Sequence, residues 1–336
     1  MSKFSNTDPR MLTILLIIFV QILGASMVLP VLPLYAQRRF AMSPELIALL
    51  VSSFFAAQFI AGPFIGRLSD LHGRVPVLIV SQIGTVISFL MLAYAQSLEV
   101  LFLSRILDGI TGGNIVVAQA YITDITPKDQ RTRALGLLFA AFGIGFVIGP
   151  ATGGILSAAF GDQIPFLVAA VAATVTVILT WRILDESVSA EKREANRTKG
   201  DGLTPLAVLR NLPLMSVLLM AFGAQFGLGI LQATFALYGD AVLFSGYQLF
   251  EAGVPGIDLV TQIYPERIVN LGIGLLLATI GLGQFITQIV ILPRLSERFN
   301  DAALVVIGTL ARSVSMVTFA VITTPYLGTI GAVFFA

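Results

Sequence analysis

Residues Gly145–Gly154 read GFVIGPATGG. Gly145, Gly149 and Gly153 recur at every fourth position, so in a helix they form one bare stripe along which a second backbone can approach closely. Pro150 removes a backbone donor and bends the helix. An apolar span tolerates this when neighbouring helices cover the freed carbonyl group. The stretch therefore predicts a tightly packed membrane helix, in which the stripe is either a plain packing surface or a functional motif.

The composition predicts a membrane protein with several spans. Hydrophobic residues make up 56% of the 336 residues and charged residues only 12%, against about 25% charged residues in soluble domains. The absence of cysteine excludes disulfides and cysteine-based metal or redox sites, and the single histidine, His72, argues against a histidine-ligated metal centre. No glycine-rich phosphate loop is present either. We expect no enzyme, no cofactor, no metal site and no nucleic-acid partner.

Apolar runs of about 20 residues predict an all-α membrane protein in two halves. An N-terminal six-helix bundle (1–184) is followed by a charged cytoplasmic linker (185–211) and an incomplete C-terminal bundle of about four helices (212–336). The predicted spans of the first half are Met11–Tyr35, Leu46–Gly66, Val75–Ala95, Val100–Ile122, Arg133–Phe160 and Ile164–Leu184. Those of the second half are Leu214–Tyr238, Ile268–Leu292, Ala303–Val321 and a tenth that begins near Tyr326.

The charges predict the orientation. Of the 20 Lys and Arg residues, 15 fall on the side that carries the amino terminus, three on the opposite side and two, Arg105 and Arg312, inside spans. The positive-inside rule therefore predicts a cytoplasmic amino terminus. The long loop Gly239–Arg267 falls on the outer side, and the sequence assigns it no role.

A short motif recurs in the two halves. The turn after the second span contains Arg67–Asp70, which reads RLSD, and the turn after the eighth contains Arg294–Glu297, which reads RLSE. The tripeptide Gln-Phe-Ile precedes both, at Gln58 and at Gln284. Two similar halves joined by a charged linker are typical of transporters built from parallel repeats.

With these motifs in place, the chain resembles the major facilitator superfamily over essentially its whole length. Gly66–Leu78 is similar to the signature loop between helices two and three, and Leu101–Gly113 to the fourth-helix motif. Gly145–Gly154, with Gly149, Pro150 and Gly153, resembles the fifth-helix motif of antiporters. Tyr121–Thr126 and Leu29–Pro33 are similar to tetracycline and multidrug efflux proteins. The resemblance implies a two-bundle fold that works by alternating access.

The chain departs from these relatives in two places. Gln21 stands where the efflux proteins typically carry an aspartate in the first helix, and an amide cannot hold and release a proton. The second half has fewer helices than the family's six, so we expect that the chain ending at Ala336 is a fragment or a truncated reading frame.

The resemblance also suggests an inner gate. It would consist of Gly66, Asp70, Gly73 and Arg74 in the signature loop together with Asp124, with ion pairs that form and break as the halves rock. The glycines favour a tight, defined turn there. The alternative for Asp124 is that it merely ends one helix before the next begins.

Two ionisable residues inside the fourth span are candidates for proton coupling, because a charge at membrane depth is costly without a partner. Arg105 and Asp108 lie three residues apart and share a helix face. Displacing Arg105 by a cationic drug or a helix movement would let Asp108 take up a proton. The competing interpretation is a permanent structural ion pair. Arg312, in the ninth span, has no acidic neighbour in the sequence and either faces the cavity or contacts another helix.

A drug site requires an apolar cavity with a few hydrogen-bonding groups. Candidate cavity residues are Gln21, Gln119, Gln225, Gln232, Gln284 and Arg312, with several phenylalanines such as Phe139 and Phe142. Each glutamine could instead make an interhelical hydrogen bond. As a group they suit an uncharged or weakly charged amphipathic substrate.

Together these features predict a monomeric drug:proton antiporter of the bacterial inner membrane, whose partners are a small-molecule substrate, protons and the lipid bilayer. A facilitator or symporter of a small metabolite shares the same fold and stays open as an alternative. So does an inactive truncated remnant.

Overall fold

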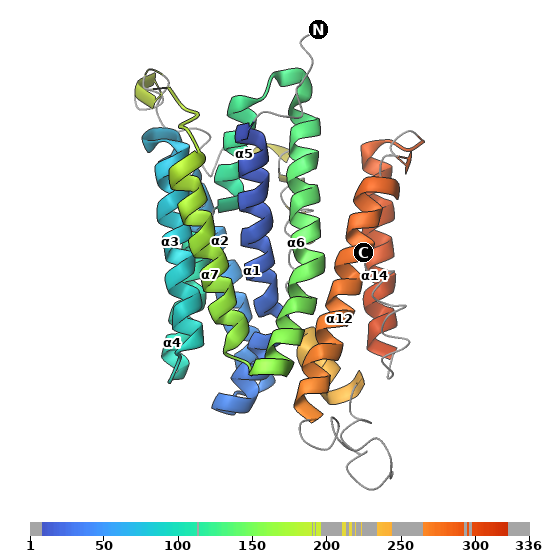
Figure 1. Cartoon of the computed structure of the whole chain (residues 1–336). Coiled ribbons are helices and arrows are strands. Elements are labelled where there is room, and N and C mark those ends of the chain that lie inside the picture. The colour runs from blue at the N-terminus through green and yellow to red at the C-terminus, as the bar shows by residue number, and fades with distance from the viewer. Residues whose placement is uncertain are drawn as a thin grey trace, which may run out of the picture.

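The computed structural model describes residues 9–112, 114–189, 234–243, 265–291, 294–295 and 298–321, with short pieces between 191 and 223. Every regular element among these residues is helical (Figure 1). The first half contains α1 (Pro9–Phe40), α2 (Pro44–His72), α3 (Arg74–Ala93), α4 (Leu98–Thr111), α5 (Asn114–Ile125), η1 (Lys128–Gln130), α6 (Arg131–Phe160) and α7 (Ile164–Ile183). The second half contains η2 (Gly239–Leu243), α12 (Pro265–Ile286), η4 (Thr287–Ile291) and α14 (Asp301–Val321).

The all-helical fold expected from the sequence is confirmed. Among the described residues, six segments are long and apolar enough to cross a membrane, and all six lie in the first half. The predicted fourth span is divided into α4 and α5 around Gly112, although the two pieces count as one segment, Leu98–Ile125. In the second half, α12 and α14 coincide with the predicted eighth and ninth spans. The tenth span, most of the seventh and most of the Gly239–Arg267 loop lie outside the described residues.

Local sequence sets the helix boundaries. At the start of α2, the hydroxyl of Ser43 accepts a hydrogen bond from the backbone N–H of Leu46, and Pro44 occupies the first turn, where no backbone donor is needed. Gly73 ends α2 with φ +106°, and Gly161 ends α6 with φ +100°. These are conformations that residues with a Cβ rarely adopt, so both turns are fixed by glycine.

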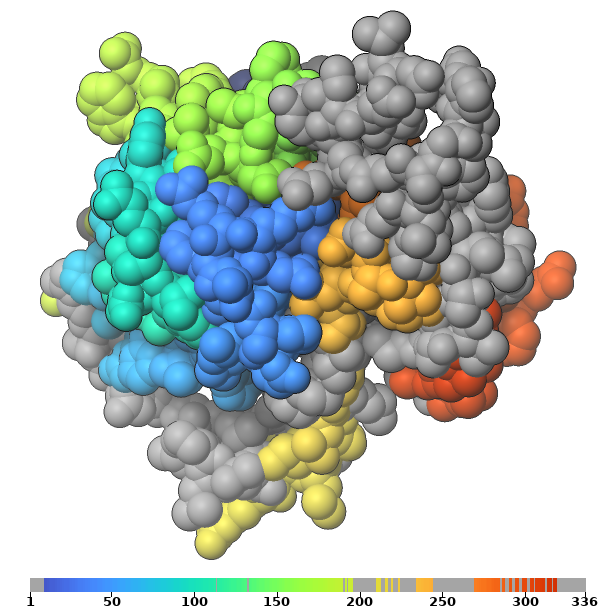
Figure 2. Space-filling model, turned by 90° about the horizontal axis from the view of Figure 1, so that it is seen from below, coloured from blue at the N-terminus to red at the C-terminus, as the bar shows by residue number. Residues whose placement is uncertain are grey.

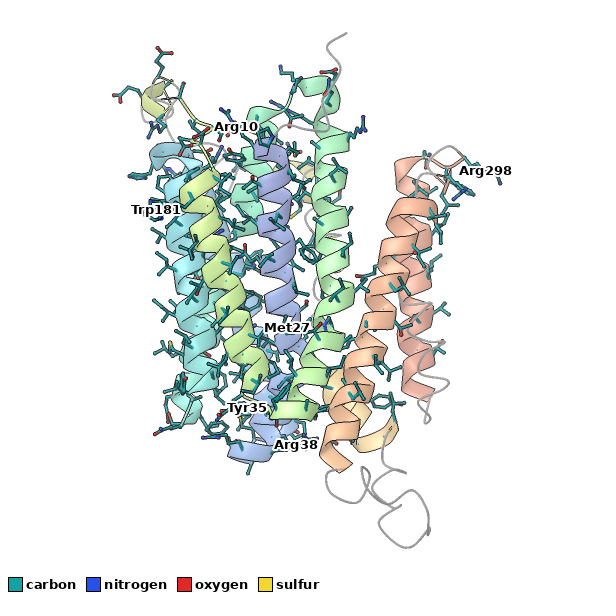
Figure 3. All side chains as sticks on the ribbon, viewed as in Figure 1. Arg10, Met27, Tyr35, Arg38, Trp181 and Arg298 are labelled. Carbon is teal, nitrogen blue, oxygen red and sulfur yellow. The ribbon has the colours of Figure 1, made fainter. Side chains whose placement is uncertain are left out.

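Arg10 lies at one end of the bundle, and Arg38 and Tyr35 lie at the other, which we call the Arg38 end (Figure 3). The first is the Arg74 end, because Arg10 pairs with Asp185, the neighbouring Glu186 accepts a hydrogen bond from Arg74, and Arg74 pairs with Asp70. Two apolar clusters fill the first half: the Arg74-end cluster includes Ile18 and Tyr121, and the Arg38-end cluster includes Tyr35 and Phe166. A third cluster joins the halves, because Leu34 of α1 packs there with Phe235, Ile273 and Leu277.

Helix α6 lies between α1 and α12 (Figure 1). Its stripe of Gly145, Gly149 and Gly153 faces α1: a Cβ added at Gly145 would lie 3.0 Å from the Phe19 carbonyl oxygen, and one added at Gly149 would lie 2.8 Å from that of Leu23. The Ser26 hydroxyl lies 3.1 Å from the carbonyl oxygen of Gly145. The glycines therefore let two helix backbones touch.

The opposite contact of α6 is made with α12 in the second half. A Cβ at Gly154 would lie 2.6 Å from the Asn270 carbonyl oxygen, and one at Gly274 would lie 2.5 Å from that of Pro150. Pro150 leaves the carbonyl of Phe146, four residues earlier, without its helical donor. Gly281 of α12 covers this group, since a Cβ there would lie 2.9 Å from the Phe146 oxygen.

Polar contacts tie the two halves together at the Arg38 end. Asn270 of α12 donates to Ser157 Oγ at 2.6 Å and to Asp162 Oδ1 at 3.0 Å, and accepts from Arg38 Nη1 at 3.1 Å. Arg38 also approaches Asp240 of η2, with 3.7 Å between Nη2 and Oδ1. Figure 2 views this end and shows atoms of the first half, in blue, directly against golden atoms of residues 234–243. The structure is therefore closed at the Arg38 end.

The packing of α6 predicts the effect of single methyl groups on stability. Gly153→Ala should destabilise the protein by about 1–3 kcal/mol, because overpacking at a backbone contact forces the helices apart; its Cβ would collide with the Met27 carbonyl. The control is Gly136→Ala in the same helix, where a Cβ meets nothing within 4 Å. It should stabilise by up to about 1 kcal/mol through helix propensity. Thermal unfolding in detergent measures both, and equal melting temperatures would contradict the close packing.

Candidate functional site

A cavity of about 560 Å³ lies between the two halves, next to the glycine stripe. Residues of α1, α2, α4, α5, α6, α12 and η4 line it. Most of these side chains are apolar, and five phenylalanines contribute: Phe54, Phe55, Phe139, Phe142 and Phe146. The polar and charged contributions are few, namely Ser26, Gln58, Arg105, Asp108, Gln119, Gln284 and Thr287. A broad apolar cavity with a few polar groups is the usual character of a small-molecule site.

The structure brings some of the predicted cavity residues together and separates others. Gln119 of the first half and Gln284 of the second half both line the cavity. Gln58 of α2 lines it too, and its Nε2 donates to the Gly112 carbonyl at 3.0 Å. Gln21 is instead buried and does not belong to the cavity lining. Gln225 and Gln232 lie outside the described residues. Arg312 belongs to α14, but its side chain is outside the described part of the chain.

The two candidates for proton coupling form one buried ion pair at the cavity wall. Arg105 Nη1 lies 3.0 Å from Asp108 Oδ2, and both side chains are less than 10% exposed. The guanidinium also lies 4.4 Å from the centre of the Phe54 ring, a cation–π contact. Gly109 permits this arrangement, because a Cβ there would collide with the Phe54 backbone, so α2 and α4 meet closely at this level.

At the Arg74 end, the residues of the predicted gate converge on one guanidinium. Arg74 contacts Asp70 of α2 at 2.6 Å and Asp124 of α5 at 3.0 Å, and it donates to Ser69 Oγ at 2.6 Å. Arg74 and Asp124 are largely buried, whereas the Asp70 side chain is 47% exposed. These contacts all lie within the first half and hold α2, α3 and α5 together.

Sequence reasoning missed a further carboxylate in this cluster. Glu186, which follows α7, accepts backbone N–H bonds from Arg74 at 2.9 Å, from Val75 at 3.2 Å and from Val188 at 3.0 Å. It thus caps the start of α3 and complements the helix dipole. The Glu186 carboxylate also occupies the space that a Cβ at Gly73 would need. Its position after an apolar span looked like ordinary linker charge, so only the fold reveals this role.

Comparison with known proteins decides the family. The family model described as "Major Facilitator Superfamily" matches residues 14–336. The chain belongs to the major facilitator superfamily. Members of this superfamily are membrane transporters. No group of three or more His, Cys, Asp or Glu residues suited to a metal ion occurs in the described ranges.

Members of the superfamily that resemble the chain include resistance proteins. It is 34% identical over 197 residues to "Tetracycline resistance protein, class H" of Pasteurella multocida, an alignment that covers 57% of this chain and 48% of that protein. It is 32% identical over 245 residues to "Multidrug resistance protein 2" of Bacillus subtilis (strain 168), covering 71% and 61% respectively. The chain thus spans between about half and two thirds of the length of these relatives.

The fold is similar to that of solved superfamily structures. The human organic anion transporter MFSD10 (TETRAN) superimposes with a TM-score of 0.65 at 19% sequence identity, over 98% of this chain and 82% of that one. At this identity the likeness shows the shared fold alone.

The unequal burial around Arg74 predicts unequal effects of neutralising its two partners. Asp124→Asn should lower the free energy of unfolding by about 2–3 kcal/mol, because it leaves a buried guanidinium with one partner fewer. Asp70→Asn should cost less than about 1 kcal/mol, since exposed ion pairs contribute little. Chemical or thermal unfolding in detergent gives the two values, and the reverse ranking would contradict the geometry at Arg74.

Proposed function

We propose that the protein exports small amphipathic, drug-like molecules in exchange for protons, by alternating access to the cavity between its halves. The observation that supports this proposal most directly is the Arg105–Asp108 pair, a buried charge pair in the wall of a mostly apolar cavity. The similarity to tetracycline and multidrug resistance proteins supports the substrate class.

The cavity suits an amphipathic substrate. Its phenylalanines offer apolar and aromatic surface, and Gln58, Gln119 and Gln284 offer both hydrogen-bond donors and acceptors. The Arg105–Asp108 pair presents no net charge. A polyanion would require several cationic groups, and Arg105 is the cation that lines the cavity among the described residues.

Proton coupling would use the same pair. In the ion-paired state the carboxylate of Asp108 is held by the guanidinium of Arg105. A cationic substrate that pairs with Asp108 competes with Arg105 for the carboxylate and keeps it ionised, because a buried charge without a partner is costly. Proton uptake by Asp108 removes the charge that holds such a substrate, so substrate and proton would bind in alternation.

The two ends would act as the two gates. The observed state is closed at the Arg38 end by α6–α12 packing and by the Asn270 contacts. With the amino terminus in the cytoplasm, as the charge distribution predicts, the closed end is the outer one. The cluster of Asp70, Arg74 and Asp124, supported by Gly66 and Gly73, would then brace the inner end of the first half as it rocks against the second.

The direct test uses inverted membrane vesicles and two probes, labelled tetracycline and a fluorescent cationic dye. Uptake should require an imposed pH gradient and stop when the gradient collapses. Asp108→Asn should reduce gradient-driven uptake by about 100-fold or more, in line with the loss of an acid–base group. The control is Asp129→Asn, an exposed acid in η1, which should leave uptake unchanged.

The outcomes separate the alternatives. Undiminished pH-driven uptake by Asp108→Asn would remove Asp108 from proton coupling. Solute movement in the direction of the proton gradient, rather than against it, would identify a symporter. Transport that ignores the gradient would identify a facilitator.

A further inference from the structure

The core of the first half is interrupted at mid-height by a polar layer. Along α1, the buried apolar residues from Met11 to Ile22 belong to the Arg74-end cluster, whereas Val28 and Val31 belong to the Arg38-end cluster. Along α3, the corresponding residues are Leu78 and Phe89. Between these levels lie the buried side chains of Gln82, Thr85, Arg105, Asp108 and Asn114, and Gln21 is buried on α1 next to Ile22.

The register of the helices places these residues at one level. Helix α3 runs antiparallel to α4 and α5: Ser88 donates to the Ser104 carbonyl at 2.8 Å near one end, and Arg74 meets Asp124 at the other. Between them, Gly84 faces the Thr111 side chain. Gln82 and Asn114 follow one step further toward the Arg74 end. Thr85 lies beside Asp108.

Several groups of this layer are buried without hydrogen-bond partners in the described structure. They are both amide atoms of Gln82, which is 1% exposed, both amide atoms of Asn114, which is fully buried, Oγ1 of Thr85, Nε of Arg105 and, on α1, Oε1 of Gln21. Buried amides without partners are unexpected, because native proteins satisfy nearly all buried polar groups, commonly with internal water.

Asp108 lies where this layer meets the cavity. One side of it faces the cavity, and Thr85 of the layer stands beside it. A bound substrate would displace cavity water from the first side. Among the described residues, the layer is the other polar surface that meets this carboxylate.

We propose that Gln82 and Asn114 form a binding site for internal water molecules, which relay protons to Asp108 while substrate fills the cavity. The inference rests on the proposed antiport function and adds a second route to its proton site. Amide groups both donate and accept hydrogen bonds, so they hold a water chain without trapping the proton.

The surrounding charges favour water over a metal cation. In the segments of α1, α2, α3, α5, α6 and α7 around this level the sequence has no Asp, Glu, His, Lys or Arg, so the charged groups here are Arg105 and Asp108. The guanidinium of Arg105, 3.0 Å from Asp108, opposes a sodium ion at that carboxylate. Uptake driven by a sodium gradient at constant pH would overturn the assignment.

Stability tests the hydration itself. Replacing an unsatisfied buried amide by an apolar group of similar shape stabilises a protein, whereas replacing a water-satisfied one does not. We therefore expect Gln82→Leu and Asn114→Leu to lower the melting temperature in detergent. Asn114→Ser, which can still bind water, should lower it less than Asn114→Leu. A rise in both leucine variants would show a dry layer and overturn the proposal. The control is Thr176→Val, equally buried in α7 but bonded to the Ala173 carbonyl at 2.7 Å.

Proton access is tested without any substrate. Because the chain has no cysteine, the substitution Gln119→Cys creates a single labelling site in the cavity wall. A bulky maleimide attached there fills the cavity and blocks proton access from that side. Infrared spectroscopy then follows hydrogen–deuterium exchange of the protonated Asp108 carboxyl, identified by its loss in Asp108→Asn. Exchange should remain fast in the blocked protein and slow by about tenfold or more with Gln82→Leu or Asn114→Leu. Asn114→Ser, which keeps a hydroxyl group, should restore much of the rate.

The possible failures are distinct. Equal exchange rates in the blocked protein with and without the leucine substitutions would overturn the relay and leave antiport standing. Absence of a protonated Asp108 band at every pH would overturn the proton role of Asp108 and the relay with it. Slowed exchange in a protein without pH-driven transport would support the relay and remove the proposed function.

Discussion

The close packing of α6 against both α1 and α12 is the constraint on which the rest of the structure depends. A membrane helix gains little from burying apolar side chains against another helix, because lipid is equally apolar. Contact therefore has to come from backbones that approach within van der Waals distance. Gly145, Gly149 and Gly153 permit this toward α1, and Gly154 permits it toward α12 through Gly274. One helix thereby belongs to both halves.

This arrangement places the cavity and also limits how it can move. The α6–α12 contact extends from Gly154 to Phe146, where Gly281 covers the carbonyl that Pro150 leaves free. Phe146 also lines the cavity. A missing helical hydrogen bond and a bare surface at the same level give a helix that can tilt without exposing an unsatisfied group to lipid. Pro150, which weakens α6, thus lies at the level where the proposed alternating access would require the helix to flex.

Polar groups are concentrated at three levels, and each has a different physical role. At the Arg38 end, Asn270 joins α12 to the first half through Ser157 and Asp162. At the Arg74 end, Arg74 and Glu186 hold the helices of the first half in register. At mid-height, Arg105 and Asp108 form a buried ion pair in the wall of the cavity. In an apolar surrounding such groups are too costly to keep unless they do something specific.

The sequence by itself determined the class of protein, the six spans of the first half and the glycine stripe, because hydropathy and fourfold spacing are local properties of the chain. It also identified Asp70, Arg74, Asp124, Arg105 and Asp108 as residues that belong together in two groups. It could not show that Gln21 is buried away from the cavity that Gln119 and Gln284 line, because both kinds of glutamine look alike on an apolar helix. Nor could it find Glu186 or the layer of Gln82 and Asn114. Their partners lie on other helices, and only the tertiary structure decides which helix faces meet.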